Sequence, residues 1–125
     1  MRLLLDTSVA LWFAEAHPRL TEAARSTIYR ADAVFVSAVS IWEIAIKAAL
    51  GKFNVDVDLV QAGLRDAGFQ PLDITWQHGR AVRDLPLYHA DPFDRLLVAQ
   101  AMSEPLQLLT SDKFLARYSD LVTVV

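Results

Sequence analysis

Short apolar runs alternate along the chain with longer segments in which apolar residues recur at helical spacing. Five apolar runs predict β-strands, at residues 2–5, 33–36, 69–72, 106–110 and 121–125. The segments between them predict helices at 8–14, 22–29, 37–50, 58–67, 75–84 and 92–104, with a short helix near 113–118. This alternation is typical of a parallel sheet that helices cover on both faces, so we expect one α/β domain over residues 1–125.

Residues that favour helix ends mark several of these boundaries. Thr7 and Ser8 are expected to cap the first helix, because hydroxyl oxygens accept hydrogen bonds from the free N–H groups there. Either Ser37 or Ser40 starts the third helix. Asp91 stands before a proline, as an N-cap residue does when a proline occupies the first turn. The stretches 51–58 and 86–92 are the expected exposed loops.

The composition favours a compact globular protein and excludes some kinds of chemistry. Of 125 residues, 54% are hydrophobic and 22% charged, which suffices for one buried core. The absence of cysteine excludes disulfides, thiolate zinc sites and cysteine nucleophiles. No apolar segment approaches the ~18 residues of a membrane span, and the apolar run at the N-terminus is too short for a signal peptide, so we expect a cytoplasmic protein. Because the net charge is −3, a nucleic-acid substrate would need a local basic surface.

Acidic residues lie in or beside four apolar segments, at Asp6, Glu43, Asp94 and Asp112. A buried carboxylate without a partner is costly, so such groups are normally paired, hydrogen-bonded or bound to metal. Asp6 and Asp112 follow predicted strands, and Asp94 lies in the first turn of a helix that leaves the same edge of the sheet. We therefore expect these three carboxylates to meet at that edge. Glu43 joins them only if its helix leans over the edge.

Several carboxylates, without cysteine or a close pair of histidines, suit hard cations such as Mg²⁺ or Mn²⁺. Such ions bind phosphate oxygens, lower the pKa of a bound water and neutralise charge on a leaving oxygen. The pattern therefore indicates metal-dependent hydrolysis of a phosphodiester, with water as the nucleophile.

Each acid also has a structural interpretation. Asp6 could cap the helix that follows it, and Asp112 could cap the short helix after it. Asp94 lies in a first turn, where the helix dipole favours any carboxylate. Asp91 is expected to act mainly as a cap and to support the site beside it. These uses do not exclude metal binding, because a carboxylate can cap with one oxygen and coordinate with the other.

Glu43 has two alternatives of its own. It could complete a capping box with Ser40, or form a salt bridge with Lys47, four residues further on. Basic residues near the expected cleft are candidate contacts with substrate phosphates, although a solvated helix face explains each equally well: Lys47, Lys52, Arg95 and Lys113. The histidines are scattered, and a loop histidine without a function is the favoured interpretation of His89, although it could touch substrate.

Four segments of the chain resemble those of PIN-domain ribonucleases. They are residues 3–8 (LLLDTS), 36–44 (VSAVSIWEI), 89–101 (HADPFDRLLVAQA) and 109–112 (LTSD). Each segment alone is a weak signal, but their order and spacing span essentially the whole chain. Together they resemble a VapC-type toxin of a bacterial toxin–antitoxin pair.

The resemblance implies a three-layer α/β/α fold and magnesium-dependent endoribonuclease activity, with Mn²⁺ as the alternative ion. It also implies a homodimer and a VapB-like antitoxin that wraps the toxin and blocks its acidic cleft. The acids that would bind the metal and carry the catalysis are Asp6, Glu43, Asp94 and Asp112. The side chains that would hold these carboxylates or waters in place are Thr7, Ser8, Asp91 and Thr110.

Two other functions stay open. The first is a catalytically silent module of the same fold that only binds RNA or a protein, which metal-independent RNA binding without cleavage would select. The second is a phosphotransfer receiver domain. Such a domain normally has paired acids after its first strand and an acceptor aspartate after its third, whereas here Asp6 is followed by Thr7 and Ser8.

Overall fold

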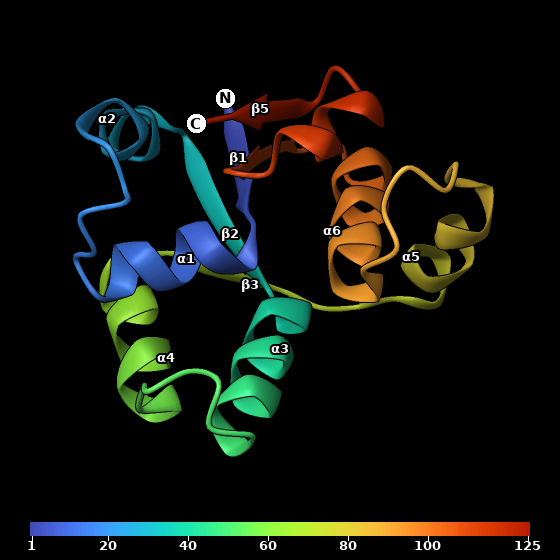
Figure 1. Cartoon of the computed structure of the whole chain (residues 1–125). Helices are drawn as coiled ribbons and strands as arrows, with labels where there is room; N and C mark the ends of the chain where they lie inside the picture. The colour runs from blue at the N-terminus through green and yellow to red at the C-terminus, as the bar shows by residue number, and fades with distance from the viewer.

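A single sheet of parallel strands forms the centre of the molecule (Figure 1), in a computed structural model that describes all residues from 1 to 125. The strands are β1 (Arg2–Leu5), β2 (Ala33–Ser37), β3 (Gln70–Leu72), β4 (Gln107–Thr110) and β5 (Val122–Val124). Their order across the sheet is β3-β2-β1-β4-β5, and every neighbouring pair is parallel. The chain therefore first builds the sheet outward from β1 to β3 and then returns to add β4 on the other side of β1.

Helices cover both faces of this sheet. The α-helices are α1 (Thr7–Ala14), α2 (Glu22–Arg30), α3 (Ala38–Ala49), α4 (Val57–Asp66), α5 (Trp76–Ala81) and α6 (Pro92–Ser103). Two short 3₁₀ helices, η1 (Val82–Asp84) and η2 (Lys113–Arg117), complete the set. In Figure 1, α1, α2 and α4 lie on one side of the sheet, and α6 lies on the other with α5 outside it. The three-layer α/β/α architecture expected from the sequence is confirmed. None of these helices combines the length and the apolarity that crossing a membrane requires.

Two hydrophobic clusters, one on each face of the sheet, form the core. In β1, Leu3 and Leu5 belong to the cluster under α1, α2 and α4, whereas Leu4 belongs to the cluster under α6. All three side chains are fully buried, as expected for a central parallel strand that is covered on both faces. Burying a leucine completely contributes about 1.5–3 kcal/mol, so this run alone anchors the centre of the sheet.

The structure identifies the N-cap residues of α1 and α3. Asp6, and not Thr7 or Ser8, caps α1, because its carboxylate accepts a hydrogen bond from the N–H of Val9 at 2.8 Å. Ser37 caps α3 through the N–H of Val39 at 3.0 Å, which decides between the two serines that the sequence left open.

Two predicted α-helices are shorter or tighter than expected. The segment 75–84 divides into α5 and the 3₁₀ turn η1, and the segment after Asp112 is the 3₁₀ helix η2. Both segments are short, and 3₁₀ helices with i→i+3 hydrogen bonds are common in short connections. At the end of α3, Gly51 has a φ of 73°, a left-handed conformation that favours glycine and stops the helix where the sequence predicts it.

Candidate metal centre at the β1–β4 edge

The carboxyl ends of β1 and β4 lie side by side where the direction of chain winding reverses. Parallel sheets characteristically bind ligands at such a point, because the connections leave it on opposite faces. The N–H of Asp6 donates to the carbonyl of Leu109 at 3.0 Å, so the pairing of the two strands continues to this edge. Asp6 directly follows β1, and Asp112 is the N-cap of η2 just beyond β4. The expected meeting of these two strand ends is therefore observed.

Asp6 is buried, with 5% of its surface exposed, and both of its carboxylate oxygens accept hydrogen bonds. Oδ1 caps α1 through the N–H of Val9, and Oδ2 accepts the hydroxyl proton of Thr110. Burial raises the pKa of Asp6 to about 6, although these two hydrogen bonds act in the opposite direction. The nearby charge of Glu43 raises the pKa as well. The capping interpretation of Asp6 is confirmed, and it coexists with a position among other carboxylates.

Asp94 lies in the first turn of α6, half-buried. Burial raises its pKa to about 7. The negative charges of Asp91, Asp6 and Glu43 also raise the pKa of Asp94, whereas His89 lowers it. Asp94 is therefore within electrostatic reach of both Asp6 and Glu43, and the loss of its proton near neutral pH is opposed by their charges.

Asp112 is held at both of its carboxylate oxygens. Oδ1 accepts the N–H of Phe114 at 2.9 Å and so caps η2, as the alternative interpretation of this residue predicts. Oδ2 lies 2.9 Å from Nε2 of His89. The same Nε2 is 3.6 Å from Oδ2 of Asp94. One possible ligand atom from each of His89, Asp94 and Asp112 lies within 4.8 Å of the others, which is the spacing that a shared metal ion requires.

Glu43 projects from α3 and is buried, with 5% exposed. Oε2 forms an ion pair with Nζ of Lys47 at 2.6 Å, so the predicted i,i+4 salt bridge is confirmed. The capping box with Ser40 is excluded, because α3 begins at Ala38 and the Ser40 hydroxyl accepts a hydrogen bond from Thr7 instead. Oε1 of Glu43 is buried and has no hydrogen-bond partner. A buried carboxylate oxygen is rarely left without a hydrogen-bond partner, and a cation is one of the few groups that can take that place.

These donors fit a hard divalent cation. The available ligand atoms are mostly carboxylate oxygens, neighbouring negative charges raise the pKa values of Asp6 and Asp94, and one buried oxygen of Glu43 lacks any partner. The three groups closest together include His89 and leave out Asp6 and Glu43, which are coupled to Asp94 through their charges. Nε2 of His89 thus stands where the sequence led us to expect further carboxylate oxygens.

Thr110 connects the two acids that follow the strands. Its hydroxyl donates to Asp6 and accepts the N–H of Asp112 at 3.0 Å. Thr7 is buried and donates its hydroxyl proton to Ser40 of α3 at 3.0 Å. Ser8 is exposed on α1.

Asp91 has the capping role that the sequence predicts. Its Oδ1 accepts the N–H groups of Phe93 at 2.8 Å and Asp94 at 3.3 Å. It therefore fixes the first turn of α6, which carries Asp94, and its charge also raises the pKa of that residue.

The basic residues have different environments. The hydrogen bond to Glu43 raises the pKa of Lys47, whose ammonium is thus already paired. Arg95 is only 9% exposed, and its guanidinium donates to the carbonyls of Val82, Leu85, Pro86 and His89 and to the Tyr118 hydroxyl. These donors hold the loop 82–89, and an RNA contact at Arg95 stays a prediction. Lys113 is exposed next to Asp112, and Lys52 is exposed after α3.

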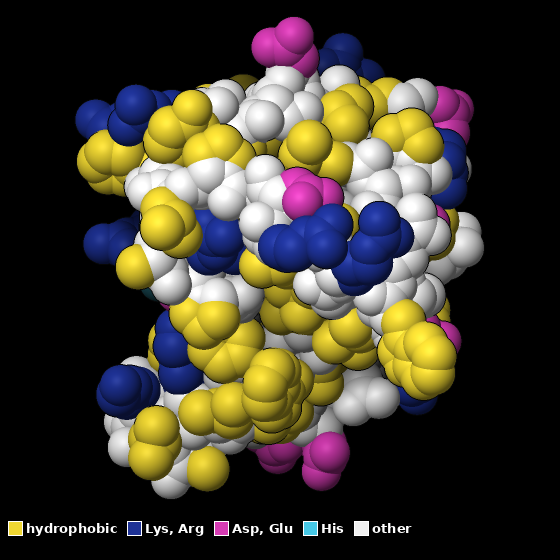
Figure 2. All heavy atoms as spheres, turned by 90° about the vertical axis from the view of Figure 1, so that its right-hand side faces the viewer, with side chains coloured by type: hydrophobic (Ala, Val, Ile, Leu, Met, Phe, Trp, Pro, Cys, Tyr) yellow, Lys and Arg dark blue, Asp and Glu magenta, His cyan; other side chains and the backbone are white.

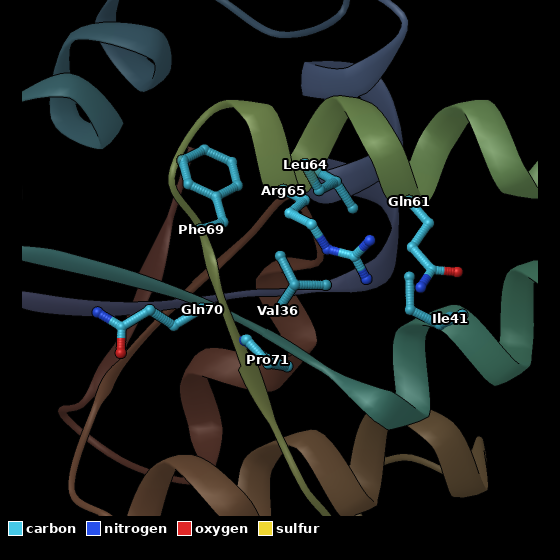
Figure 3. Close-up of a pocket in the computed structure, with 8 residues that line it drawn as sticks. All are labelled: Val36, Ile41, Gln61, Leu64, Arg65, Phe69, Gln70 and Pro71. Atoms are coloured by element: carbon cyan, nitrogen blue, oxygen red, sulfur yellow. The ribbon is translucent and has the colours of Figure 1, made fainter.

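A hollow of the surface lies elsewhere, between α3, α4 and the edge of the sheet. Its mainly apolar lining comes from α3, α4, β2 and β3, and includes Val36, Ile41, Leu64 and Phe69, with Arg65 and Gln61 reaching into it from α4 (Figure 3). None of the acids lines it. The candidate metal centre is therefore defined by its charged groups and not by this hollow.

A model of the PIN domain matches residues 3–121. The chain belongs to the PIN domain family. A sequence relative, "Ribonuclease VapC22" of Mycobacterium tuberculosis, is 29% identical over 117 residues, which cover 89% of this chain and 87% of that protein. The expected PIN family membership is therefore confirmed.

Solved structures of PIN-fold proteins resemble the whole chain. VapBC2 from Rickettsia felis, bound to a promoter DNA fragment, superposes with a TM-score of 0.70 at 14% identity, covering 100% of this chain and 98% of that chain. A toxin–antitoxin complex from Klebsiella pneumoniae also gives a TM-score of 0.70, at 15% identity, covering 98% of this chain and 96% of that one. At these identities the likeness establishes the shared PIN fold.

Proposed function

We propose that this PIN domain is a metal-dependent endoribonuclease and the toxin of a toxin–antitoxin pair. The observation that carries the proposal is the close approach of Asp94, Asp112 and His89, beside a buried oxygen of Glu43 without a partner. The relative named as a ribonuclease supports the choice of RNA as substrate. We take residues 1–125 to act as one catalytic domain.

Asp6, Glu43, Asp94 and Asp112 are the residues that would hold Mg²⁺ or Mn²⁺. Such an ion supplies positive charge for the phosphodiester and makes a water molecule more acidic. The residues of the chain do the remaining work. Asp6 and Asp112 are fixed by Thr110 and by helix N–H groups, so their free lone pairs have defined directions.

Glu43 is assigned to orienting the attacking water. Oε2 is neutralised by Lys47, whereas Oε1 is buried and free to accept a hydrogen bond. Asp94 has a raised pKa of about 7, and positive charge beside it would lower that pKa and favour the ionised carboxylate. Cation binding and proton release at Asp94 are therefore coupled in this proposal.

Lys113 and Arg117 are the proposed contacts for RNA phosphates. Both lie on η2, which begins immediately after Asp112. Both side chains are exposed, and the guanidinium of Arg117 lies 4.5 Å from the ring centre of Tyr88. A half-exposed aromatic ring with a guanidinium above it, next to His89 in sequence, gives a surface on which a base could stack. Lys47 neutralises Glu43 in this proposal. Replacing Lys47 should therefore disturb the carboxylate of Glu43 and not remove a direct contact with RNA.

The proposed partners are a VapB-like antitoxin and a second copy of the chain, in the cytoplasm. Structural relatives that are themselves toxin–antitoxin complexes support the antitoxin. Apolar and basic side chains gather together on the face formed by α5 and its neighbours (Figure 2). Trp76 is 97% exposed and Leu87 87% exposed, and large apolar side chains in the open are typical of surfaces that bind another protein.

A cleavage assay on an RNA oligonucleotide tests the proposal. The wild-type chain should cleave in Mg²⁺ or Mn²⁺, lose activity in EDTA, and recover it when the ion returns. Asp94→Asn should be inactive at every ion concentration, whereas Arg30→Ala, at an exposed basic residue in the last turn of α2, should cleave normally. Activity in EDTA would contradict the metal dependence. RNA binding without cleavage by the wild type would select the catalytically silent alternative.

A further inference from the structure

We propose that His89 is a positioning residue, which holds Asp112 through a hydrogen bond from its Nε2–H and is not a ligand of the cation. The proposal rests on the metal-dependent function above and adds a residue that the sequence had left without a role. At first sight His89 has the spacing of a third ligand, because its ring nitrogen lies with the oxygens of Asp94 and Asp112. The hydrogen bonds around the ring decide against that assignment.

The other ring nitrogen fixes the tautomer. The backbone N–H of Asp91 donates to Nδ1 of His89 at 3.0 Å, so Nδ1 must present a lone pair. A neutral imidazole carries one proton, which is therefore on Nε2. Nε2–H then donates to Oδ2 of Asp112 at 2.9 Å, and Nε2 lies 3.6 Å from Oδ2 of Asp94. A nitrogen that carries a proton has no lone pair in the ring plane for a metal.

Hydrogen bonds of the surrounding loop hold the His89 ring in place. The backbone N–H of His89 donates to the Tyr118 hydroxyl at 2.9 Å, and Nη1 of Arg95 donates to the same hydroxyl at 3.2 Å. Nη1 of Arg95 also donates to the carbonyl of Pro86 at 2.8 Å. Changing the tautomer would bring an Nδ1–H against the Asp91 N–H, and separating the two would strain the hydrogen bonds that hold the loop. The surroundings therefore maintain Nε2–H.

The consequence falls on Asp112. Its Oδ1 is occupied by the Phe114 N–H and its Oδ2 by His89, so the carboxylate cannot rotate without breaking one of these bonds. The lone pairs that remain on each oxygen are the ones available to a cation. Partners that orient a metal ligand in this way typically contribute tenfold to a hundredfold in metal affinity or activity.

His17 provides a matched control within the same chain. It also lies in a loop, and its Nδ1 accepts the backbone N–H of the residue two positions on, Arg19, at 3.1 Å. Its ring stacks on Trp12, and no carboxylate contact is made by its Nε2. A substitution at His17 therefore repeats the local backbone effect of the same substitution at His89 without the contact to Asp112.

The first experiment is imidazole ¹⁵N NMR on the whole chain at mildly alkaline pH, without metal and with Mg²⁺. The proposal predicts that His89 stays in the Nε2–H tautomer in both states. An Nδ1–H tautomer, with or without metal, would overturn it. This readout does not depend on any RNA cleavage, so it decides the role of His89 even if the proposed nuclease activity fails.

The second experiment measures Mn²⁺ affinity and RNA cleavage for His89→Ala, His89→Gln, His17→Ala and His17→Gln, each checked by circular dichroism. His89→Ala should weaken Mn²⁺ binding about tenfold to a hundredfold. His89→Gln, whose amide N–H can replace Nε2–H, should recover most of that loss, and the His17 variants should match the wild type. Unchanged affinity in His89→Ala, or no recovery in His89→Gln, would overturn the positioning role. A wild-type chain that binds Mn²⁺ but cleaves no RNA would contradict the nuclease proposal alone.

Discussion

The hydroxyl of Thr110 donates a hydrogen bond to the carboxylate of Asp6, which is 104 residues away in the sequence. The same hydroxyl accepts the N–H of Asp112. One side chain at the end of β4 thus links the acid that follows β1 to the acid that follows β4. Because Thr110 is completely buried, this link lies beneath the carboxylates and sets their relative positions.

Replacing Thr110 with valine should destabilise the chain by about 1–3 kcal/mol, because a buried oxygen of Asp6 loses its donor. The same change should raise the pKa of Asp6 further, since the Thr110 hydrogen bond lowers it. Urea unfolding at neutral pH measures the first effect. Thr110→Ser keeps the hydroxyl and serves as the control. Equal stability of the valine variant and the wild type would show that the link contributes nothing.

Asp6 has two functions that its substitutions should separate. Asn is as good an N-cap as Asp, so Asp6→Asn should fold with the stability of the wild type or slightly more, while RNA cleavage is abolished. Asp6→Ala should be equally inactive and also lose about 1 kcal/mol, because α1 loses its cap. Thermal unfolding and the cleavage assay, run on both variants, test this. Cleavage by Asp6→Asn would remove Asp6 from the catalytic group.

The stability of the metal-free chain should fall as the pH rises. Asp6 and Asp94 have folded pKa values of about 6 and about 7, above the ordinary value of 3.8, so between these limits the folded chain binds more protons than the unfolded one. Their contribution is fully present below the unfolded pKa and is lost as the pH rises through the folded values.

Asp94→Asn isolates one part of this dependence. The melting temperature of the variant should fall less between mildly acidic and neutral pH than that of the wild type, because one of the two titrating acids is gone. Mn²⁺ should reduce the decline in the wild type and have a much smaller effect in the variant. Identical melting curves for the two proteins across this range would contradict the raised pKa of Asp94.

Arg95 and Lys113 should respond in opposite ways. Arg95→Lys should lower the free energy of unfolding by about 1–3 kcal/mol, since a lysine cannot donate to all of the half-buried carbonyls that the guanidinium holds. Lys113→Ala should leave stability unchanged and raise the KM for RNA, with a weaker salt dependence of binding. Chemical unfolding and steady-state kinetics distinguish the two. A stable Arg95→Lys variant with impaired RNA binding would support the expected RNA contact at Arg95.

The sequence predicts the sheet and its edge well for a physical reason. An apolar run such as Leu3-Leu4-Leu5 can be accommodated only where both faces are covered, and helices between such runs impose parallel pairing. The acids that follow β1 and β4 must then lie near each other. What could be predicted was therefore set by periodicity and by chain order.

The role of His89 and the burial of Arg95 could not be predicted in this way. Both depend on how the loop 86–91 folds back over α6, and this is fixed by contacts with Tyr118, far along the chain. The sequence around a basic residue near an acidic cleft does not show whether its side chain is buried against backbone carbonyls or exposed to RNA. His89 had one usable signal, since it begins the segment HADPFD that ends in Asp94.

The location of the cation tests the central claim most directly. Crystals of the wild-type chain soaked in Mn²⁺ and measured at the manganese absorption edge should give an anomalous peak at the carboxyl ends of β1 and β4. The peak should be in contact with carboxylate oxygens of Asp94 and Asp112, and Nε2 of His89 should remain bound to Asp112. Fully soaked crystals without a peak at this edge, or with manganese bound only at other surfaces, would contradict the proposed metal centre.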